Sequence, residues 1–412
     1  MTIASKQKLK MICGFIVLLF LGTTMAWSVF LVPIESTFGW SRSQTSLAAT
    51  ICTMCFSVGS ILTGILSKKF SFSTILKIAG GLLFGGFFIA SLLQKGNSIL
   101  LLYLSYSVLV GTSAGMGYNC VLSSVPMWMS DKPAVANGIL LMGYALSTAL
   151  FAPVINTLLT VTNSVSFVFR TLALVCGIGV LVFSFFVRIP TIDEMKELPQ
   201  RDRNAGKNDH SVITGDMVKM PLFWVLYLIS ILLPAIGLAI NNHNSPILTE
   251  IGSNAAFAAT VVSICAIVNG LSRFVFGFIF EKLGSKNAMV VVSTIGVIAM
   301  GVITLGYSTG SLYIYILGAC LVMVSFGFAA TSWPSIMRDL FGHRTFSLNY
   351  SVLCTDTFFN AWMASIVGLM QTSSGSYLSP LIMLLVVAVV NLVVAMLYVV
   401  LYNKEMKKRE EA

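Results

Sequence analysis

Charged side chains are scarce in this sequence of 412 residues, because Asp, Glu, Lys and Arg make up only 10% of it. An ordinary soluble domain contains about 25% charged and about 45–50% apolar residues, whereas hydrophobic residues make up 57% here. This composition excludes a chain that folds entirely in water. Runs of about 20 mostly apolar residues, the length that a helix needs to cross a bilayer, follow one another along the chain. We therefore expect a membrane protein whose partner is the lipid bilayer.

Histidine and the motifs of energy-coupled enzymes are also lacking. The three histidines, His210, His243 and His343, are widely separated, and two of them fall in loops. They do not form the ligand set of a metal site. No G-x-x-x-x-G-K-[ST] loop for nucleotide phosphates is present, and no soluble stretch is long enough to hold a nucleotide-binding domain. We expect no enzymatic activity, no metal and no cofactor.

Acidic residues are outnumbered, with 15 Asp and Glu against 25 Lys and Arg, which gives a net charge of +10. The basic residues lie in short clusters between apolar runs rather than along one soluble face, so they do not indicate binding to nucleic acid. Nearly all fall in one set of loops, with Arg42 and Lys95 among the exceptions. The positive-inside rule then predicts an inner (cytoplasmic) membrane protein with both termini in the cytoplasm.

The apolar runs predict an all-α fold with twelve transmembrane helices. The predicted spans are residues 11–33, 44–66, 74–94, 98–121, 133–157, 165–188, 220–241, 256–280, 287–307, 311–335, 347–371 and 378–402. The charged stretch around 189–219 cannot bury itself and is predicted to be a cytoplasmic linker. It separates a six-helix bundle at 1–188 from a second six-helix bundle and cytoplasmic tail at 220–412.

The two halves resemble each other. VPIESTFG, which begins at Val32, resembles SPILTEIG, which begins at Ser245. The ends of the second and eighth spans match in the same way, with GILSKKFS at Gly64 and GFIFEKLG at Gly277. In both pairs the residue numbers of the two segments differ by the same amount. The numbers of two asparagines near the starts of spans five and eleven differ by almost the same amount. This regularity predicts a duplicated six-helix unit and hence two pseudo-symmetric bundles.

The turn after the eighth span, GFIFEKLGSK, resembles the cytoplasmic loop signature of the major facilitator superfamily. A glycine allows close helix contact, an acid and a base form a charged latch at the membrane face, and a second glycine permits the tight turn. The first-half copy is degraded, because Lys68 stands where an acid is usual and Ser71 replaces the turn glycine. The predicted conformational latch consists of Gly277, Glu281, Lys282 and Gly284.

Five further segments resemble the oxalate:formate antiporter family and the related monocarboxylate porters. They are AWSVFLVPIESTFGWSRSQ, GTSAGMGYN, MWMSDKPAVANGILLMGYALSTALFAP, NGLSRFVFG and SWPSIMRDLFG, in this order along the chain. The resemblance implies a secondary transporter of a small organic anion, driven by a proton or a counter-anion gradient through alternating access. We expect it to function as a monomer.

An isolated charge in the eighth predicted span marks a candidate site. Arg273 lies in an otherwise apolar helix, where its insertion costs about 2.5–3.5 kcal/mol. Asn269 is four residues earlier and so shares its helix face. Arg273 matches the arginine that binds the substrate carboxylate in the family, and its planar fork suits a carboxylate better than a lysine does. We predict that both residues contact the substrate.

Asp356 is the acidic residue deepest within a predicted span, and it leaves two readings of Arg273 open. The two side chains could form a structural ion pair, or Asp356 could hold the arginine until a proton and a carboxylate arrive. The sequence departs from its relatives at Thr357, where the oxalate transporter resemblance implies a lysine, so a dianion such as oxalate is disfavoured. Asn269, where animal monocarboxylate porters usually have an aspartate, cannot titrate.

The remaining candidates lie at polar or aromatic positions, and for Tyr118, Tyr144 and Trp333 helix packing or interface anchoring is an equally good explanation. His243, at the end of the seventh span, is a candidate for proton coupling or gating. Further substrate-binding candidates are Tyr118, Tyr144, Trp333 and Asn360. Two other functions fit the same fold, namely efflux of a larger amphipathic anion or drug and a non-transporting membrane sensor.

Overall fold

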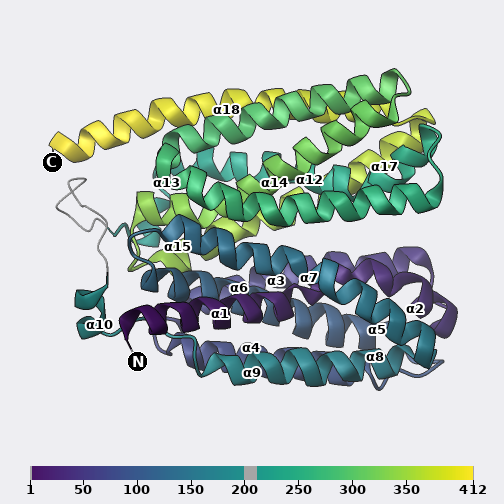
Figure 1. The fold of residues 1–412 in the computed structure, drawn as a ribbon, viewed down its shortest axis with the longest axis horizontal. Coiled ribbons are helices and arrows are strands. Elements are labelled where there is room, and N and C mark those ends of the chain that lie inside the picture. Colours follow the sequence, from purple (N-terminus) through teal and green to yellow (C-terminus); the bar gives the residue numbers. More distant parts are fainter. Residues whose placement is uncertain (1, 199–210, 412) are drawn as a thin grey trace. The chain divides into compact units, whose positions relative to one another are not determined.

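A computed structural model describes residues 2–198 and 211–411 and contains helices throughout (Figure 1). Part of the predicted linker, residues 199–210 with His210, lies outside the described residues, as do the two terminal residues. The contacts divide the chain into two compact units. Unit 1 contains residues 1–210 and 343–355, and unit 2 contains residues 211–342 and 356–412.

Unit 1 consists of helices of the first half and one short helix from far along the chain. Its helices are α1 (Ile3–Leu21), η1 (Gly22–Val29), α2 (Leu31–Phe38), α3 (Arg42–Leu66), α4 (Phe72–Ala90), α5 (Ile99–Leu102), η2 (Tyr103–Val110), α6 (Gly111–Ser124), η3 (Val125–Trp128), α7 (Pro133–Thr162), α8 (Val165–Leu172), η4 (Ala173–Gly177), α9 (Ile178–Ser184), α10 (Ile192–Glu197) and α15 (Phe346–Leu353). Within it α3 packs on α6, α1 on α7, and α4 on α6 and α9.

Unit 2 contains longer helices, among which α13 packs on α14 and α18, and α12 packs on α14, α17 and α18. Its helices are α11 (Thr214–Met217), α12 (Pro221–Glu250), α13 (Ala255–Ser308), α14 (Leu312–Phe341), α16 (Thr357–Asn360), α17 (Trp362–Ser374) and α18 (Leu378–Glu411). The short η5 (Cys354–Asp356) crosses the boundary between the units.

Eleven helices of the described residues are long and apolar enough to cross a membrane. One of them, α13, has 54 residues, which at about 1.5 Å per residue is far longer than a bilayer core. Gly284 interrupts it with φ 69° and ψ 170°, values open to glycine but strained for other residues. The parts at 255–283 and 285–308 correspond to two of the twelve predicted spans, so the predicted all-α architecture is confirmed.

Small residues let the helices of unit 1 approach closely where α6 crosses α3. A Cβ atom added at Gly115 would lie 1.8 Å from the carbonyl oxygen of Phe56, and one at Gly111 would lie 2.5 Å from that of Cys52. Glycines spaced four apart therefore put α6 in backbone contact with α3. This contact fixes the position of Tyr118, one turn farther along α6.

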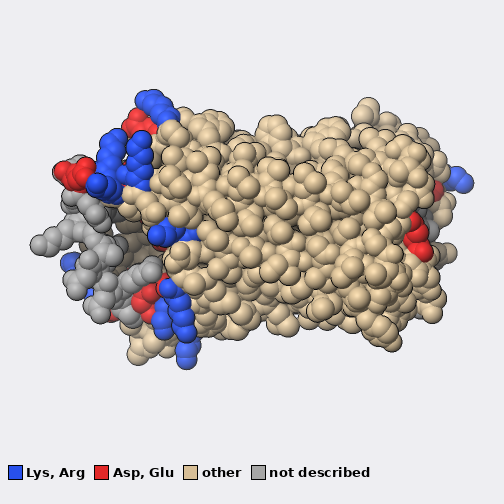
Figure 2. Space-filling model, turned by 90° about the horizontal axis from the view of Figure 1, so that it is seen from above, with Lys and Arg blue, Asp and Glu red and all other residues tan. Residues whose placement is uncertain are grey.

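Most charged side chains lie near the ends of the helices. On the face shown in Figure 2, Lys and Arg gather at the end where α18 finishes, and uncharged residues cover the wide band beside it. Lys407, Lys408 and Arg409 belong to this charged end of α18. Such a band is what contact with lipid tails requires, since an unpaired charge there is costly.

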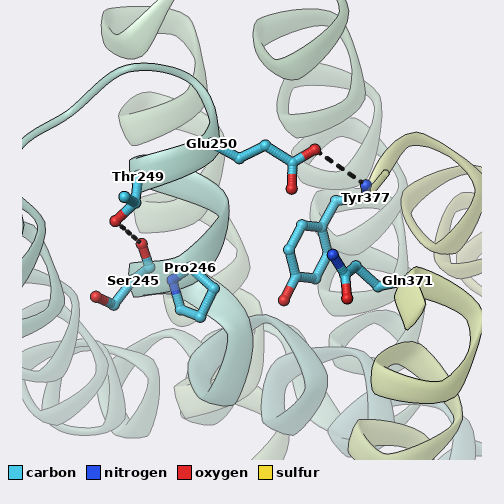
Figure 3. A pocket seen from close by; sticks show the side chains of 6 residues that line it. All are labelled: Ser245, Pro246, Thr249, Glu250, Gln371 and Tyr377. Carbon is cyan, nitrogen blue, oxygen red and sulfur yellow. Dashed lines mark hydrogen bonds between the residues drawn. The ribbon is translucent and has the colours of Figure 1, made fainter. Parts of the chain in front are cut away.

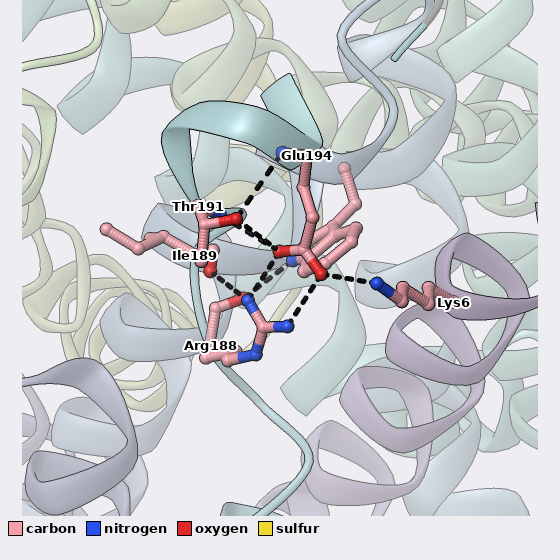
Figure 4. Close-up of polar contacts among 6 residues, drawn as sticks. Lys6, Arg188, Ile189, Thr191 and Glu194 are labelled. Carbon is pink, nitrogen blue, oxygen red and sulfur yellow. Dashed lines mark hydrogen bonds and ion pairs between the residues drawn. The ribbon is translucent and has the colours of Figure 1, made fainter. Parts of the chain in front are cut away.

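A buried carboxylate joins the start of the chain to the segment that follows α9 in unit 1 (Figure 4). The Glu194 carboxylate accepts hydrogen bonds from both terminal nitrogens of Arg188, at 2.7 and 2.8 Å, and from Lys6 Nζ at 2.8 Å. Thr191 completes a capping box with Glu194 at the start of α10. The Arg188 and Lys6 hydrogen bonds and those from Thr191 hold the pKa of Glu194 well below its usual range.

Replacement of Glu194 by Gln should destabilise the protein at pH 7 by about 2 kcal/mol, because charged hydrogen bonds are lost. A carboxylate with a lowered pKa stabilises the fold above its unfolded pKa of about 4.3, and this stabilisation disappears as the pH falls through the folded pKa. The difference between wild type and variant should therefore shrink in acid. Thermal unfolding in detergent from pH 7 to pH 3 measures it.

Asp193→Asn is the matched control, since this neighbouring carboxylate is 91% exposed and pairs with Lys196 at the surface. It should change stability by less than about 0.5 kcal/mol. Equal effects of the two substitutions would show that Glu194 does not anchor the chain.

Candidate functional site

Arg273 and Asn269 lie together on α13 of unit 2. The Nε of Arg273 donates a hydrogen bond of 3.2 Å to the Oδ1 of Asn269, and both side chains are buried. The Nδ2 of Asn269 donates to the carbonyl oxygen of Met323 on α14, also at 3.2 Å. The amide is thus oriented by α14 and in turn orients the guanidinium plane. This arrangement pre-organises a buried cation for a planar anion.

The backbone around Arg273 is held tightly against α14. The hydroxyl of Thr331 lies 3.3 Å from the carbonyl oxygen of Arg273 and 3.2 Å from that of Gly327, and it can donate to either. A Cβ at Gly327 would lie 1.9 Å from Ser272 Oγ and 2.6 Å from the carbonyl oxygen of Asn269. The two helices therefore pack closely at the level of the Asn269–Arg273 pair, because Gly327 has no side chain there. Trp333, two residues beyond Thr331, is buried on the same helix.

Asp356 lies where the eleventh predicted span is broken. The helix stops at Leu353, turns through η5, and resumes as α16 and α17. Asp356 is buried, with Ser230 of α12 and the backbone of Thr357 within hydrogen-bonding reach of its carboxylate. The boundary between the two compact units falls between Thr355 and Asp356. The contacts of Arg273 and Asn269 thus involve α13 and α14, whereas those of Asp356 involve α12.

Asn360, one turn after Asp356, has an unusual environment. It is only 3% exposed, and its Oδ1 accepts no hydrogen bond from any residue that the structure describes. Leaving a buried acceptor unsatisfied costs about 1–3 kcal/mol. A buried carbonyl oxygen in this state is a candidate acceptor for a bound molecule or water.

In unit 1, the tyrosine candidates belong to an aromatic cluster. The ring of Tyr118 packs edge-on against Tyr144 at 5.2 Å and against Phe56 at 5.1 Å between ring centroids. Tyr350 of α15 stacks on Tyr118 at 6.5 Å, and its hydroxyl lies 3.5 Å from that of Tyr118. The cluster is therefore built from α3, α6, α7 and α15.

Residues 343–355 follow α14 in the sequence, where the repeat places them in the second half, yet their contacts group them with unit 1. Polar bonds explain this attachment. Asn119 Nδ2 donates at 3.0 Å to the carbonyl oxygens of Ser347 and Ser60, and Ser347 Oγ donates to Asn119 Oδ1 at 3.2 Å. Ser57 Oγ donates at 2.8 Å to the carbonyl oxygen of Cys354, directly before the break in the span. The chain thus connects unit 1 to Asp356 through α15.

The predicted latch residues surround the interruption of α13. Gly277 is buried, Glu281 is partly exposed and Lys282 is exposed. Two hydrogen bonds at this turn involve the residues just after Gly284. Ser285 Oγ donates to Asp339 Oδ2 of α14 at 2.7 Å, and Lys286 Nζ donates to Asn403 Oδ1 of α18 at 3.2 Å.

His243 lies near the other end of unit 2, toward the end of α12. Its Nδ1 is 3.1 Å from the hydroxyl oxygen of Tyr377, and its Nε2 is 2.9 Å from the carbonyl oxygen of Ala364 on α17. The ring therefore bridges α12, α17 and the turn before α18. It lies apart from the Asn269–Arg273 pair along the helices.

The sequence profile of the Major Facilitator Superfamily matches residues 12–355. The chain belongs to this superfamily. The fold agrees with it: the proton:xylose symporter XylE bound to 6-bromo-6-deoxy-D-glucose superposes with a TM-score of 0.74 over 97% of both chains, at 12% identity. FucP in the outward conformation superposes with a TM-score of 0.68 over 95% of this chain and 98% of its own, also at 12% identity. At such identities the likeness shows the fold alone.

Characterised relatives include carriers of organic anions. The oxalate:formate antiporter of Oxalobacter formigenes is 24% identical over 80% of this chain and 76% of its own length. Monocarboxylate transporter 12 of Mus musculus is 23% identical over 67% of this chain and 60% of its own length. The uncharacterized MFS-type transporter YhjX of Escherichia coli is 22% identical over 81% of this chain. The predicted resemblance to this part of the superfamily is therefore confirmed.

Several residues that contact the candidate site residues of this major facilitator were not predicted from the sequence. Gly327 stands four residues before Thr331, a spacing of small residues that could have marked the close contact of α13 with α14. Asn119 lies in a segment that carried the family resemblance, but nothing in the sequence says that it bonds to Ser347. Ser230 and Tyr377 could not be predicted, since a lone serine in a span and a lone tyrosine in a turn are ordinary.

Asn119→Ala should loosen α15 from unit 1, because buried hydrogen bonds to Ser60 and Ser347 are removed at about 1 kcal/mol each. Amide hydrogen exchange in peptides covering 343–355 should accelerate by roughly ten- to thirtyfold. Ser123→Ala is the control, because Ser123 donates only to Asn119 Oδ1 at 2.8 Å and its loss leaves both bonds from Nδ2 in place. An unchanged exchange rate in Asn119→Ala would show that packing alone holds α15.

Proposed function

We propose that this protein is a secondary active transporter of a small organic anion, a monocarboxylate, with Arg273 as the residue that binds the carboxylate. The observation that carries the proposal is the buried side chain of Arg273 on α13, whose Nε donates a hydrogen bond to Asn269 and is oriented by it. A cation inside a membrane helix needs an anionic partner, and a carboxylate matches the geometry of the guanidinium fork. The anion-carrying relatives support the same substrate class.

A singly charged substrate is favoured over a dianion. Thr357 stands beside Asp356, at the place where the resemblance to the oxalate transporter implies a second cation. One buried guanidinium balances one carboxylate, whereas a second carboxylate would enter the low-dielectric site unpaired. Asn360, with its unsatisfied Oδ1, suits a hydroxyl donor on the substrate, and Trp333, Tyr118 and Tyr144 complete the proposed substrate contacts.

The driving force that we propose is a proton gradient or exchange with another anion, with Asp356 as the proton-coupling residue. Asp356 is buried at the break of the eleventh span, where the chain passes from unit 1 to unit 2. Protonation would change the charge in the segment where the chain passes from one unit to the other, and alternating access moves one half of such a transporter against the other. Gly277, Glu281, Lys282 and Gly284 are the proposed conformational latch.

The proposed location is the cytoplasmic membrane, with both termini in the cytoplasm and the monomer as the functional form. The basic residues at the end of α18 support this orientation through the positive-inside rule. Residues 1–188 and 220–412 remain the proposed six-helix bundles, joined by the linker 189–219. We propose neither enzymatic activity nor a cofactor.

Arg273→Ala should lower carboxylate uptake about 30- to 100-fold, since a charged, bidentate contact is worth roughly 2–3 kcal/mol. Arg273→Lys should restore part of the rate, because the charge remains but the fork is lost. The measurement is uptake of labelled lactate, pyruvate, formate, oxalate and larger acids into proteoliposomes, with and without a pH gradient. Arg170→Ala is the control, since Arg170 is an exposed arginine at the start of another span.

Wild-type uptake by Arg273→Ala, in protein that is folded and inserted, would leave only a structural role for Arg273. Failure of every carboxylate to move or to compete would rule out the proposed substrate class.

Asp356→Asn should abolish the stimulation of uptake by an imposed pH gradient, because the side chain can no longer exchange a proton, while exchange of carboxylate across the membrane continues. Initial rates at matched internal and external pH, compared with rates under a gradient, separate the two activities. Asp216→Asn, at an exposed aspartate paired with Lys219, should keep the stimulation. A gradient effect of full size in Asp356→Asn would remove Asp356 from the coupling mechanism.

A further inference from the structure

A cavity of about 610 Å³ lies in unit 2 at the end where α18 begins (Figure 3). With the proposed orientation, this is the external end. Five of its six lining residues are polar, and Glu250 supplies the carboxylate among them. The lining residues are Ser245, Pro246, Thr249, Glu250, Gln371 and Tyr377.

Tyr377 connects the carboxylate of this pocket to His243, because its backbone bonds on one side and its hydroxyl on the other. The backbone N–H of Tyr377 lies 3.4 Å from Glu250 Oε1 and 3.1 Å from the hydroxyl oxygen of Tyr307, and it can donate to either. The Tyr307 hydroxyl itself donates to the Glu250 carboxylate and lies 2.9 Å from Ser376 Oγ. The hydroxyl at the other end of the Tyr377 side chain lies 3.1 Å from His243 Nδ1. These contacts join α12, α13 and the turn before α18.

The partners of His243 fix its tautomer. The carbonyl oxygen of Ala364 can only accept, so the Nε2 that lies 2.9 Å from it carries a hydrogen. In the neutral ring Nδ1 has no hydrogen and accepts the one from the Tyr377 hydroxyl at 3.1 Å. Nδ1 is therefore the one position on the ring where a proton can be added, and Tyr377 controls access to it.

The charge of the cluster changes when that proton is added. The titratable groups around the ring are Glu250 on α12, Tyr307 on α13 and Tyr377, whereas α17 contributes the Ala364 carbonyl and Gly368, beside which the ring lies. Burial, with the nearby Glu250 charge, raises the pKa of Tyr377, so this phenol stays protonated. With a neutral ring the cluster carries the single negative charge of Glu250, and with a protonated ring its net charge is zero.

We propose that this pocket is an external proton-binding site that admits the carboxylate substrate only after His243 has been protonated. The hydroxyl of Tyr377 passes its hydrogen to Nδ1 and receives another from a hydronium ion on the pocket side. The ring gains the positive charge, the phenol stays neutral, and one water molecule is released. The negative potential at the entrance is then cancelled, and an organic anion can approach. This inference rests on the proposed function for the identity of the anion.

The first test does not depend on transport. Full-length protein with His210→Gln and His343→Gln, labelled with ¹⁵N-histidine, is titrated by NMR. At high pH the spectrum should show the tautomer with hydrogen on Nε2. Glu250→Gln should move the titration midpoint of His243 to lower pH, because it removes a negative charge that stabilises the charged ring. A hydrogen on Nδ1 in the neutral ring, or a midpoint unchanged by Glu250→Gln, overturns the proposal.

The second test measures uptake of labelled lactate and formate at external pH 5.5 and 7.5. In the wild type the KM for external carboxylate should be roughly three- to tenfold lower at pH 5.5, the size expected for one partly screened charge. His243→Gln should keep the high KM at both pH values, and Glu250→Gln should have the low KM already at pH 7.5. Ser373→Ala, at an exposed serine of α17, should behave as wild type.

The outcomes separate the two proposals. If no carboxylate is transported but the NMR titration behaves as described, the proposed substrate class fails and the proton site stands. If carboxylate is transported and the KM of His243→Gln still falls tenfold at pH 5.5, the proton site fails and the transport function stands.

Discussion

The constraint that governs this protein is that a charge or polar group inside a membrane helix must be satisfied by other protein groups, because lipid offers none. Arg273 shows how the chain meets this constraint. The amide of Asn269 donates a hydrogen bond to Met323 on α14 and accepts one from Arg273 on α13. Gly327 allows the two helices to come close enough for this geometry. Functional chemistry in such a protein depends on helix contact as much as on the functional residue itself.

Polar side chains are also satisfied by other protein groups before and after the break in the eleventh span. Asn119, Ser347 and Ser57 bind α15 to unit 1 through buried hydrogen bonds. Beyond the break, Asp356 and Asn360 lie in unit 2. The segment after α14 is therefore anchored in unit 1 by α15, whereas the residues that follow its break belong to unit 2.

Near the ends of the helices, the side chains of Glu194 and His243 are likewise satisfied by other protein groups. Glu194 gathers Lys6 and Arg188 around one carboxylate and ties the first helix to the start of the linker. His243 is bound between the Tyr377 hydroxyl and the Ala364 carbonyl, which leaves one ring nitrogen for a proton. In both places hydrogen bonds hold a polar side chain between elements that are distant in the sequence.

The sequence alone determined the helices, their number and the superfamily, because apolar length and the turn chemistry around Gly284 are local properties of the chain. It also determined that Arg273 and Asn269 share a face, since a helix places residues four apart side by side. Only the tertiary structure decided that residues 343–355 pack with unit 1, that Ser230 approaches Asp356, and that Tyr377 meets His243. These contacts join residues far apart in sequence through single hydrogen bonds, and neither periodicity nor composition encodes which pair will meet.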